Sequence, residues 1–218
     1  MQIYREHELE AAPGLPEPLP AGERVLWQGS PDWKRLALGA FHVKRIAFYF
    51  GFMLLLQAVL IWDSSDILRA NLVPLAWSAS MALIALGLLG FTAWMSATTT
   101  LYTLTNRRMV MRIGIVLTIS FNLPLRWIAA AHVKTNQDGS GDIALELKGS
   151  DRIAYLHLWP HARAWHVAHT QPALRCLPDV GTAGDLLHAA WIARQTELGG
   201  AEPRESIPVR MPAVAIAR

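Results

Sequence analysis

The chain has 218 residues, 52% of them hydrophobic, and a formal net charge of +3 at pH 7. Hydrophobic content is only slightly above the usual share of about 45–50%, so any apolar surplus must be local. The small positive charge argues against a nucleic-acid partner, and the single cysteine, Cys176, excludes an internal disulfide framework and a paired-cysteine metal or redox site.

Residues 1–31 are predicted to form an extended, proline-rich arm. Prolines recur through its middle, and proline fixes φ and removes a backbone donor. Within the arm, residues 23–31 alternate enough to form a short strand. The first ten residues mix acidic and basic side chains and no apolar stretch follows them, so we expect no signal peptide.

Residues 32–45 are predicted to form an amphipathic helix at a membrane surface. Asp32 is a suitable N-cap for a helix over residues 33–45. Lys44 and Arg45 at its end are candidate contacts for anionic lipid head groups, and each basic side chain contributes on the order of 1 kcal/mol there.

Residues 46–97 are predicted to form a transmembrane hairpin. Residues 46–62 and 72–95 are two uncharged apolar runs, and a spanning helix needs about 20 such residues. The alternative, a buried helical hairpin in a soluble protein, is disfavoured by the length of the second run. Lys and Arg residues flank the hairpin on both outer sides, which predicts that both termini are cytoplasmic.

Small residues of the second run form two pairs spaced four apart, Ala76 with Ser80 and Ser78 with Ala82. Such pairs permit close helix approach, so the two spans either pack on each other or present Ser80 and Ala82 to a helix of another membrane protein. Neither run contains an ionisable side chain, which argues against a proton or ion pathway.

Residues 98–196 are predicted to form a small α+β domain on the cytoplasmic side. Alternating apolar positions at 117–123 and 143–147 indicate half-buried strands, and residues 106–107 and 136–141 are typical of turns. Residues 153–159 are also expected to be a strand, so the pattern favours a small antiparallel barrel or sandwich. Thr182 and Asp185 predict the cap of a closing helix, and residues 197–218 are expected to be a flexible tail.

Two segments, residues 22–31 before the hairpin and 102–114 after it, resemble the bacterial pleckstrin-homology-like membrane protein family. The resemblance implies a two-span hairpin followed by a small antiparallel PH-like β-barrel with a C-terminal helix as its cap. Residues 158–163 and 171–175 further resemble photosynthetic-complex assembly proteins of purple bacteria. That resemblance implies a non-enzymatic protein of the intracytoplasmic membrane whose partners are light-harvesting 1 and reaction-centre subunits.

Four histidines gather late in the chain, at His157, His161, His166 and His169. Imidazoles ligate metals and the magnesium of bacteriochlorophyll. Pro160 interrupts any helix that would align them, however, and no acid or cysteine lies among them. We therefore expect surface or internally bonded histidines and no resident cofactor, with transient bacteriochlorophyll contact as the alternative.

Three arginines, Arg107, Arg108 and Arg112, lie within one predicted hairpin. They are candidate contacts for anionic lipid or for acidic ends of partner proteins, and the alternative is a topology signal with a solvated turn. The sequence has no nucleophile elbow, phosphate-binding glycine loop or paired carboxylate motif, so no enzymatic activity is expected.

Two functions follow from these features. The first is an assembly factor that holds subunits through its spans and its cytoplasmic barrel. The second is a lipid-sensing or stress-related module whose barrel binds anionic head groups. The sequence leaves open a permanent structural role in a complex and a homodimer.

Overall fold

The computed structural model describes residues 15, 18–62, 72–115, 117–149, 153–164, 166 and 169–199. Contacts divide the chain into two compact units: one comprises Met1–Asp32 with Ser96–Arg218, and the other comprises Trp33–Met95. The loop between the predicted spans and the predicted tail beyond Gly199 lie outside the described residues, as do most residues of the predicted arm before Pro18.

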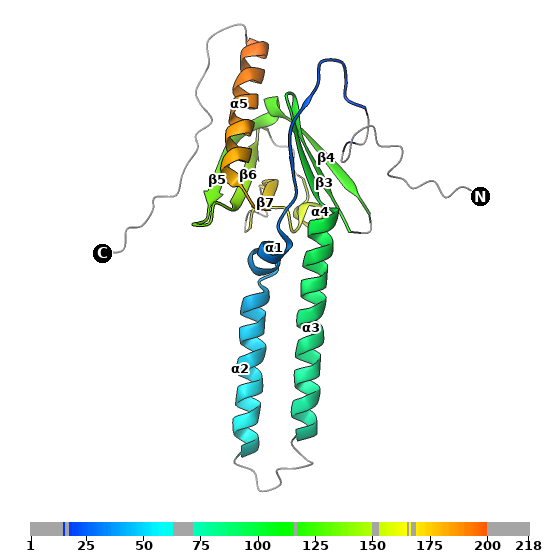
Figure 1. The fold of residues 1–218 in the computed structure, drawn as a ribbon, viewed down its shortest axis with the longest axis vertical. Helices are drawn as coiled ribbons and strands as arrows, with labels where there is room; N and C mark the ends of the chain where they lie inside the picture. Colours follow the sequence, from blue (N-terminus) through cyan, green and yellow to red (C-terminus); the bar gives the residue numbers. More distant parts are fainter. Residues whose placement is uncertain are drawn as a thin grey trace, which may run out of the picture. The chain divides into compact units, whose positions relative to one another are not determined.

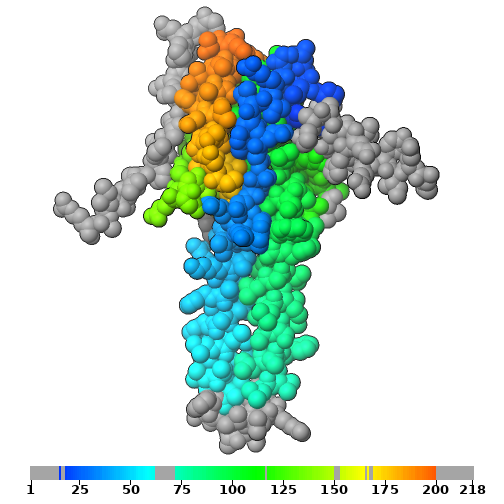
Figure 2. All heavy atoms as spheres, viewed as in Figure 1, coloured from blue at the N-terminus to red at the C-terminus, as the bar shows by residue number. Residues whose placement is uncertain are grey.

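The described residues of the unit Trp33–Met95 form helices, with a short break at residues 40–42. It contains α1 (Trp33–Gly39), α2 (Val43–Trp62) and most of α3 (Leu72–Thr99). Two segments, Val43–Ile61 and Leu72–Thr99, are long and apolar enough to cross a membrane. On the face drawn in Figure 2, the side chains of α2 (cyan) and α3 (green) form the surface of this unit. The two apolar helices predicted from the sequence are confirmed.

The predicted single helix over residues 33–45 is wrong, because α1 ends at Gly39 and α2 begins at Val43. The NH groups of Ala40 and Phe41 both donate to the carbonyl of Leu36, at 2.9 and 3.2 Å, and close the end of α1. His42 then adopts a positive φ of 52°, which a continuous helix does not allow. A glycine near the end of an apolar helical pattern is a typical stop signal.

The other unit contains two antiparallel sheets, as Figure 1 shows. The four-stranded sheet has the order β1-β2-β3-β4, with strands Val25–Gly29, Leu101–Thr105, Arg108–Ile113 and Ile119–Pro124. A short 3-10 helix, η2 (Leu125–Trp127), leads to the second sheet. The three-stranded sheet has the order β5-β6-β7, with strands Ile128–Thr135, Gly141–Leu147 and Ala173–Leu177.

Strand β1 precedes the two long helices in the chain and yet pairs with β2, which follows them. Val25 lies opposite Thr105 and Gly29 opposite Tyr102. Residues assigned to an N-terminal arm therefore complete the sheet, and a domain bounded at residue 98 lacks its first strand. The alternation of residues 23–31 correctly predicted a strand, but its partner lies beyond the reach of a local pattern.

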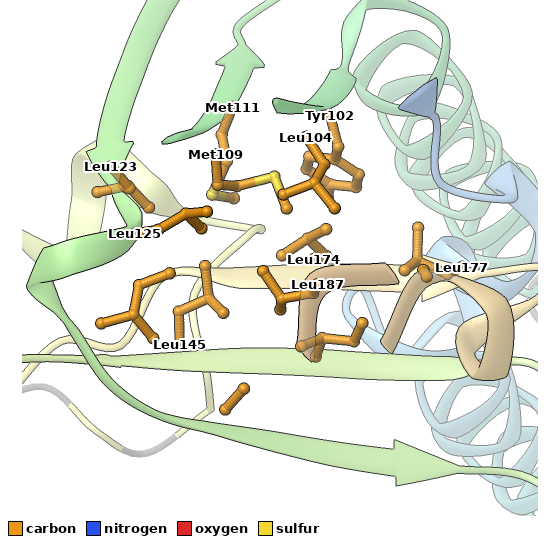
Figure 3. Close-up of a cluster of buried hydrophobic side chains, with 14 of the residues drawn as sticks. Tyr102, Leu104, Met109, Met111, Leu123, Leu125, Leu145, Leu174, Leu177 and Leu187 are labelled. Carbon is orange, nitrogen blue, oxygen red and sulfur yellow. The ribbon is translucent and has the colours of Figure 1, made fainter. Parts of the chain in front are cut away.

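The core lies between the two sheets and the C-terminal helix α5 (Val180–Gly199). In Figure 3 leucine and methionine side chains from β3, β6 and β7 point toward one another, together with Leu187 from α5. Trp191 of α5 is also buried, and its indole NH donates to the carbonyl of Ile128 at 3.2 Å. The predicted PH-like α+β fold is confirmed: the small antiparallel barrel expected from the sequence is built from two antiparallel sheets, and a C-terminal helix closes it.

Two local predictions in this unit are wrong. The segment expected as a strand over residues 153–159 forms a short helix, α4 (Tyr155–Leu158). Tyr155 and Leu158 both reach the core while Leu156 is 86% exposed, and that spacing of three fits a helical turn rather than a strand.

Helix α5 begins at Val180, earlier than the predicted cap at Thr182. The Asp179 carboxylate accepts hydrogen bonds from the NH of Thr182 at 3.1 Å and from its hydroxyl at 2.6 Å. These bonds, led by the one from the hydroxyl, hold the pKa of Asp179 below its ordinary value. Asp179 is therefore the N-cap, and Thr182 is one of the residues that it caps.

We predict that Leu187→Ala lowers the free energy of unfolding by about 2–5 kcal/mol, because it opens a cavity beneath α5. The control is Leu198→Ala on the same helix, where the side chain is 50% exposed. Chemical denaturation of the full chain in detergent measures both. Equal losses in the two variants would contradict the described packing of α5.

Candidate functional site

The β2–β3 hairpin holds its three predicted contact arginines at opposite ends. Arg112 lies opposite Leu101, next to the end of α3, whereas Arg107 occupies the turn after β2. A five-residue strand separates the two ends, or about 17 Å at about 3.3 Å per residue. The extended hairpin therefore separates Arg112 from the other two arginines that the sequence predicts as contacts, and contact with lipid or with a partner stays a prediction.

Arg108 is part of an internal ion pair. Its Nε and Nη2 donate to the Glu23 carboxylate at 2.7 and 3.1 Å, and the hydroxyl of Thr105 donates to the same carboxylate at 2.8 Å. The Glu23 side chain is only 2% exposed, so its charge depends on these donors. The pair fastens the segment before β1 to the start of β3, and that role accounts for the Arg108 charge.

A hollow of about 290 Å³ opens beside this ion pair. Its polar lining consists of one carboxylate, one amide and four guanidinium groups, from Glu23, Asn122, Arg107, Arg108, Arg126 and Arg194. Pro20 and Pro124 complete its walls. We call this feature the arginine hollow. Sequence reasoning found two of its four arginines and missed Arg126 and Arg194, because they come from η2 and α5.

The small residues of α3 do not share one face. Ser80 is exposed and its hydroxyl donates to the carbonyl of Ala76 at 2.8 Å, whereas Ala82 is only 5% exposed. The predicted docking face that combines Ser80 with Ala82 is therefore corrected, since two positions apart on a helix point in nearly opposite directions. Ala76 and Ser80, both exposed, remain a candidate pair for an outside helix.

Lys44 and Arg45 are exposed in the first turn of α2. Two basic side chains at a helix N-terminus interact unfavourably with the positive end of the helix dipole, so α2 does not stabilise their charges. Their position at one end of a candidate span suits contact with anionic head groups, and that contact stays a prediction.

A chain of hydrogen bonds surrounds the buried side chain of His161. Its Nδ1 lies 2.6 Å from the phenol oxygen of Tyr102, and its Nε2 lies 3.1 Å from the hydroxyl of Thr100 and 3.4 Å from that of Ser96. The Tyr102 oxygen also accepts the NH of Arg175 at 3.2 Å. The last turn of α3, strand β2 and strand β7 are thus joined through one imidazole.

The hydrogen bonds around His161 all run in one direction, from donor to acceptor. The Thr100 hydroxyl donates to the carbonyl of Ser96 at 2.7 Å, so its oxygen is left to accept from His161. That contact puts the imidazole proton on Nε2 and leaves Nδ1 to accept from the Tyr102 phenol. The bonds therefore run from the Arg175 NH through Tyr102, His161 and Thr100 to the Ser96 carbonyl.

This geometry fixes the protonation of two groups. Burial, together with the nearby Arg175 charge, lowers the pKa of His161 to about 3. Burial also raises the pKa of Tyr102 well above its ordinary value. Both side chains are neutral at physiological pH, and the His161 ring nitrogens already have protein partners. His161 is therefore a structural residue and a poor ligand for a metal or a pigment.

The other three clustered histidines, His157, His166 and His169, retain some exposure. Across the described residues, no three side chains among His, Cys, Asp and Glu gather closely enough to hold a metal ion. The sequence cluster is thus divided in space, with His161 in the interior and the others nearer the surface.

Strand β7 also holds the segment before α1. The NH of Asp32 donates to the carbonyl of Cys176 at 2.9 Å. Cys176 has a positive φ of 54° at a bulge, and the Asp142 carboxylate accepts its NH at 2.7 Å. Arg175 Nε lies 3.3 Å from the same carboxylate. No sequence motif indicates this arrangement, because it joins residues from three distant segments.

Comparison with known proteins supplies a family and a relative. Residues 40–191 match the model of the bacterial PH domain family. Over 193 residues, the chain is 34% identical to an uncharacterized 23.7 kDa protein in the puhA 5' region of Rhodobacter capsulatus, covering 88% of this chain and 90% of that protein. No solved structure matches the chain.

We predict that His161 makes the fold sensitive to acid. Its pKa is about 3 when folded and 6.5 ordinarily, so between these values the unfolded chain binds a proton that the folded chain does not. The stability that neutral His161 contributes is complete above pH 6.5 and is lost as pH falls toward 3, by about 1.4 kcal/mol per unit.

Chemical denaturation of the full chain in detergent at several pH values measures this dependence. His161→Asn should reduce the slope, whereas His169→Asn, which changes an exposed histidine, should retain it. Identical slopes for the wild type and His161→Asn would rule out the buried neutral imidazole.

Proposed function

Because this chain belongs to the bacterial PH domain family, we propose that it is a non-enzymatic membrane assembly factor for the photosynthetic reaction centre and its light-harvesting 1 complex. In this role it is similar to the photosynthetic-complex assembly protein PuhB. The observation that carries the proposal is the relative in the puhA 5' region, whose similarity extends over nearly the whole of both chains.

The proposed location is the bacterial inner membrane, with α2 and α3 as spans. Pairing of β1 with β2 supports an even number of crossings, since residues on either side of the two helices must meet in one sheet. Lys44 and Arg45 in the first turn of α2 and the arginines after α3 support a cytoplasmic position for both ends of the hairpin.

In the proposed mechanism, the spans bind the helix of a subunit while the PH-like unit contacts its cytoplasmic end. Because Ala76 and Ser80 are small and exposed, the backbone of another helix can approach α3 closely at these positions. Exposed aromatic side chains of the same helix, Trp77 at 69% and Phe91 at 55%, add apolar surface to α3. An assembly factor must also release its client, so moderate affinity is expected; a micromolar Kd corresponds to about −8 kcal/mol.

The test is an affinity pull-down of the tagged full chain from mildly solubilised photosynthetic membranes. Mass spectrometry should identify light-harvesting 1 or reaction-centre polypeptides, and near-infrared absorbance reports any bacteriochlorophyll that they carry. Recovery of anionic lipid without these polypeptides would contradict the assembly role and favour a lipid-sensing module.

We predict that Ser80→Leu reduces recovery of these subunits by at least about fivefold, because the larger side chain keeps the partner helix away. Gly51→Leu on α2 is the matched control, since a Cβ atom there meets nothing within 4 Å in the described residues. Ala82→Leu is unsuitable, because it would overpack a buried position. Equal recovery with Ser80→Leu and the wild type would exclude this face of α3.

A further inference from the structure

We propose that the arginine hollow binds an extended acidic segment of a partner protein, with its carboxylates seated on Arg107 and Arg126. This inference rests on the proposed function in one respect: it names the chemistry of the contact made by the PH-like unit. The hollow itself is defined by residues of that unit alone.

The first argument is charge. Glu23 neutralises Arg108, and Arg194 donates to Glu197 at 2.7 Å. Within the described part of the chain, neither Arg107 nor Arg126 forms an ion pair, and both are exposed. Two guanidinium groups therefore face one hollow without an acidic partner, and each offers the planar set of donors that matches a carboxylate.

The second argument is rigidity. The Asn106 side chain donates to the carbonyl of Gly22 at 3.0 Å and accepts the NH of Arg24 at 3.0 Å, which fixes the turn that carries Arg107. The carbonyl of Arg107 accepts the NH of Leu125 at 3.0 Å. A fixed backbone reduces the entropy that a ligand must overcome on binding.

Arg126 is also placed by a neighbour, because its guanidinium lies 6.0 Å from the ring centre of Trp127. A cation over an aromatic face is attracted to it, and that attraction favours one position of a long side chain. The hollow thus has two cationic groups contributed by separate elements, one on the fixed backbone of the β2–β3 turn and one on η2.

The third argument concerns distance along the hairpin. The turn at Arg107 is separated by the length of β2 from Leu101, which lies opposite Arg112. That length, about 17 Å, is about twice the screening distance of about 8 Å at physiological ionic strength. The charge of Arg112 is therefore largely screened from the hollow, and Arg107 and Arg126 are left as the cations that a carboxylate meets there.

The fourth argument is the strand beside the hollow. Asn122 and Pro124, which line it, belong to β4, and β4 is an edge of the four-stranded sheet. An edge strand can add an extended peptide through backbone hydrogen bonds, and alternate side chains of that peptide then lie on one face. The hollow, at about 290 Å³, has room for acidic side chains but little more.

The experiment uses the full chain in nanodiscs of neutral lipid and a fluorescent peptide that alternates glutamate with alanine. Fluorescence anisotropy at low salt should give a Kd on the order of 10 μM. The matched peptide with glutamine in place of glutamate should not bind. Arg107→Ala and Arg126→Ala should each weaken binding by about tenfold, the loss expected for a charge-assisted hydrogen bond.

Arg112→Ala is the matched control, because it removes the same charge from the other end of the same hairpin. It should change the Kd by less than about twofold. Arg108→Ala is avoided, since it would leave the buried Glu23 carboxylate without its main donor. Equal weakening by Arg112→Ala, or equal binding of the glutamine peptide, would overturn the proposal.

A second arm replaces neutral lipid with phosphatidylglycerol and adds glycerol phosphate as a soluble competitor. Peptide binding that persists under both conditions supports the peptide site. If phosphatidylglycerol or glycerol phosphate displaces the peptide from the wild type, and this displacement is absent in Arg107→Ala, the hollow binds a head group and the proposal is overturned. If the peptide fails to bind while photosynthetic subunits still co-purify, only the proposal for the hollow is rejected. If the peptide binds but no photosynthetic subunits co-purify, only the assembly role is rejected.

Discussion

The structure depends on strand β7, which contacts the residues of its own unit that precede and follow the segment Trp33–Met95. The NH of Asp32, just before that segment, donates to the carbonyl of Cys176. Ser96, just after it, is joined through Thr100, His161 and Tyr102 to the NH of Arg175. Adjacent residues of one short strand thus anchor the chain where it leaves and where it re-enters the sheeted unit. Because these contacts are buried polar groups, losing one leaves its neighbour unsatisfied.

The same unit uses its charges in two different ways. Glu23 and Arg108 are paired inside, where the hydrogen bonds connect strands that are distant in the chain. Arg107 and Arg126 are exposed at the neighbouring hollow and add nothing to that internal network. Arg107 and Arg108, which are next to each other in the sequence, therefore lie in different surroundings: Arg108 is bonded to a buried carboxylate, and Arg107 is exposed at the hollow.

The sequence predicted the features that depend on local patterns. Uninterrupted apolar runs gave the two long helices, alternation gave most strands, and residues 136–141 gave a turn. It failed where a distant contact decides: β1 belongs to the sheet because β2 returns to it, and α4 is helical because Tyr155 and Leu158 both reach the core. Gly39 is a local signal for the break before α2, but the amphipathic pattern on both sides of it favoured one continuous helix.

The candidate site was predicted only in part for the same reason. Arg107 is recognisable as a turn residue, but Arg126 and Arg194 come to the hollow through folding and carry no local signal. His161 belonged to a visible cluster of histidines, yet its role follows from burial and from Tyr102, which is 59 positions away. Spacing in the sequence therefore overstated the association of Arg107 with Arg112 and of the histidines with one another.

Pairing between β1 and β2 also sets an order of events during synthesis. Gln28 and Thr103 bond across the two strands although they are 75 positions apart. At a translation rate of about 5–20 residues per second, β1 leaves the ribosome on the order of 4–15 s before its partner exists. For that time it is an unpaired strand, and both long helices must be made before the sheet can close. The nascent chain therefore has an aggregation-prone interval, and its duration is set by the length of the helical insert rather than by the folding rate of the sheet.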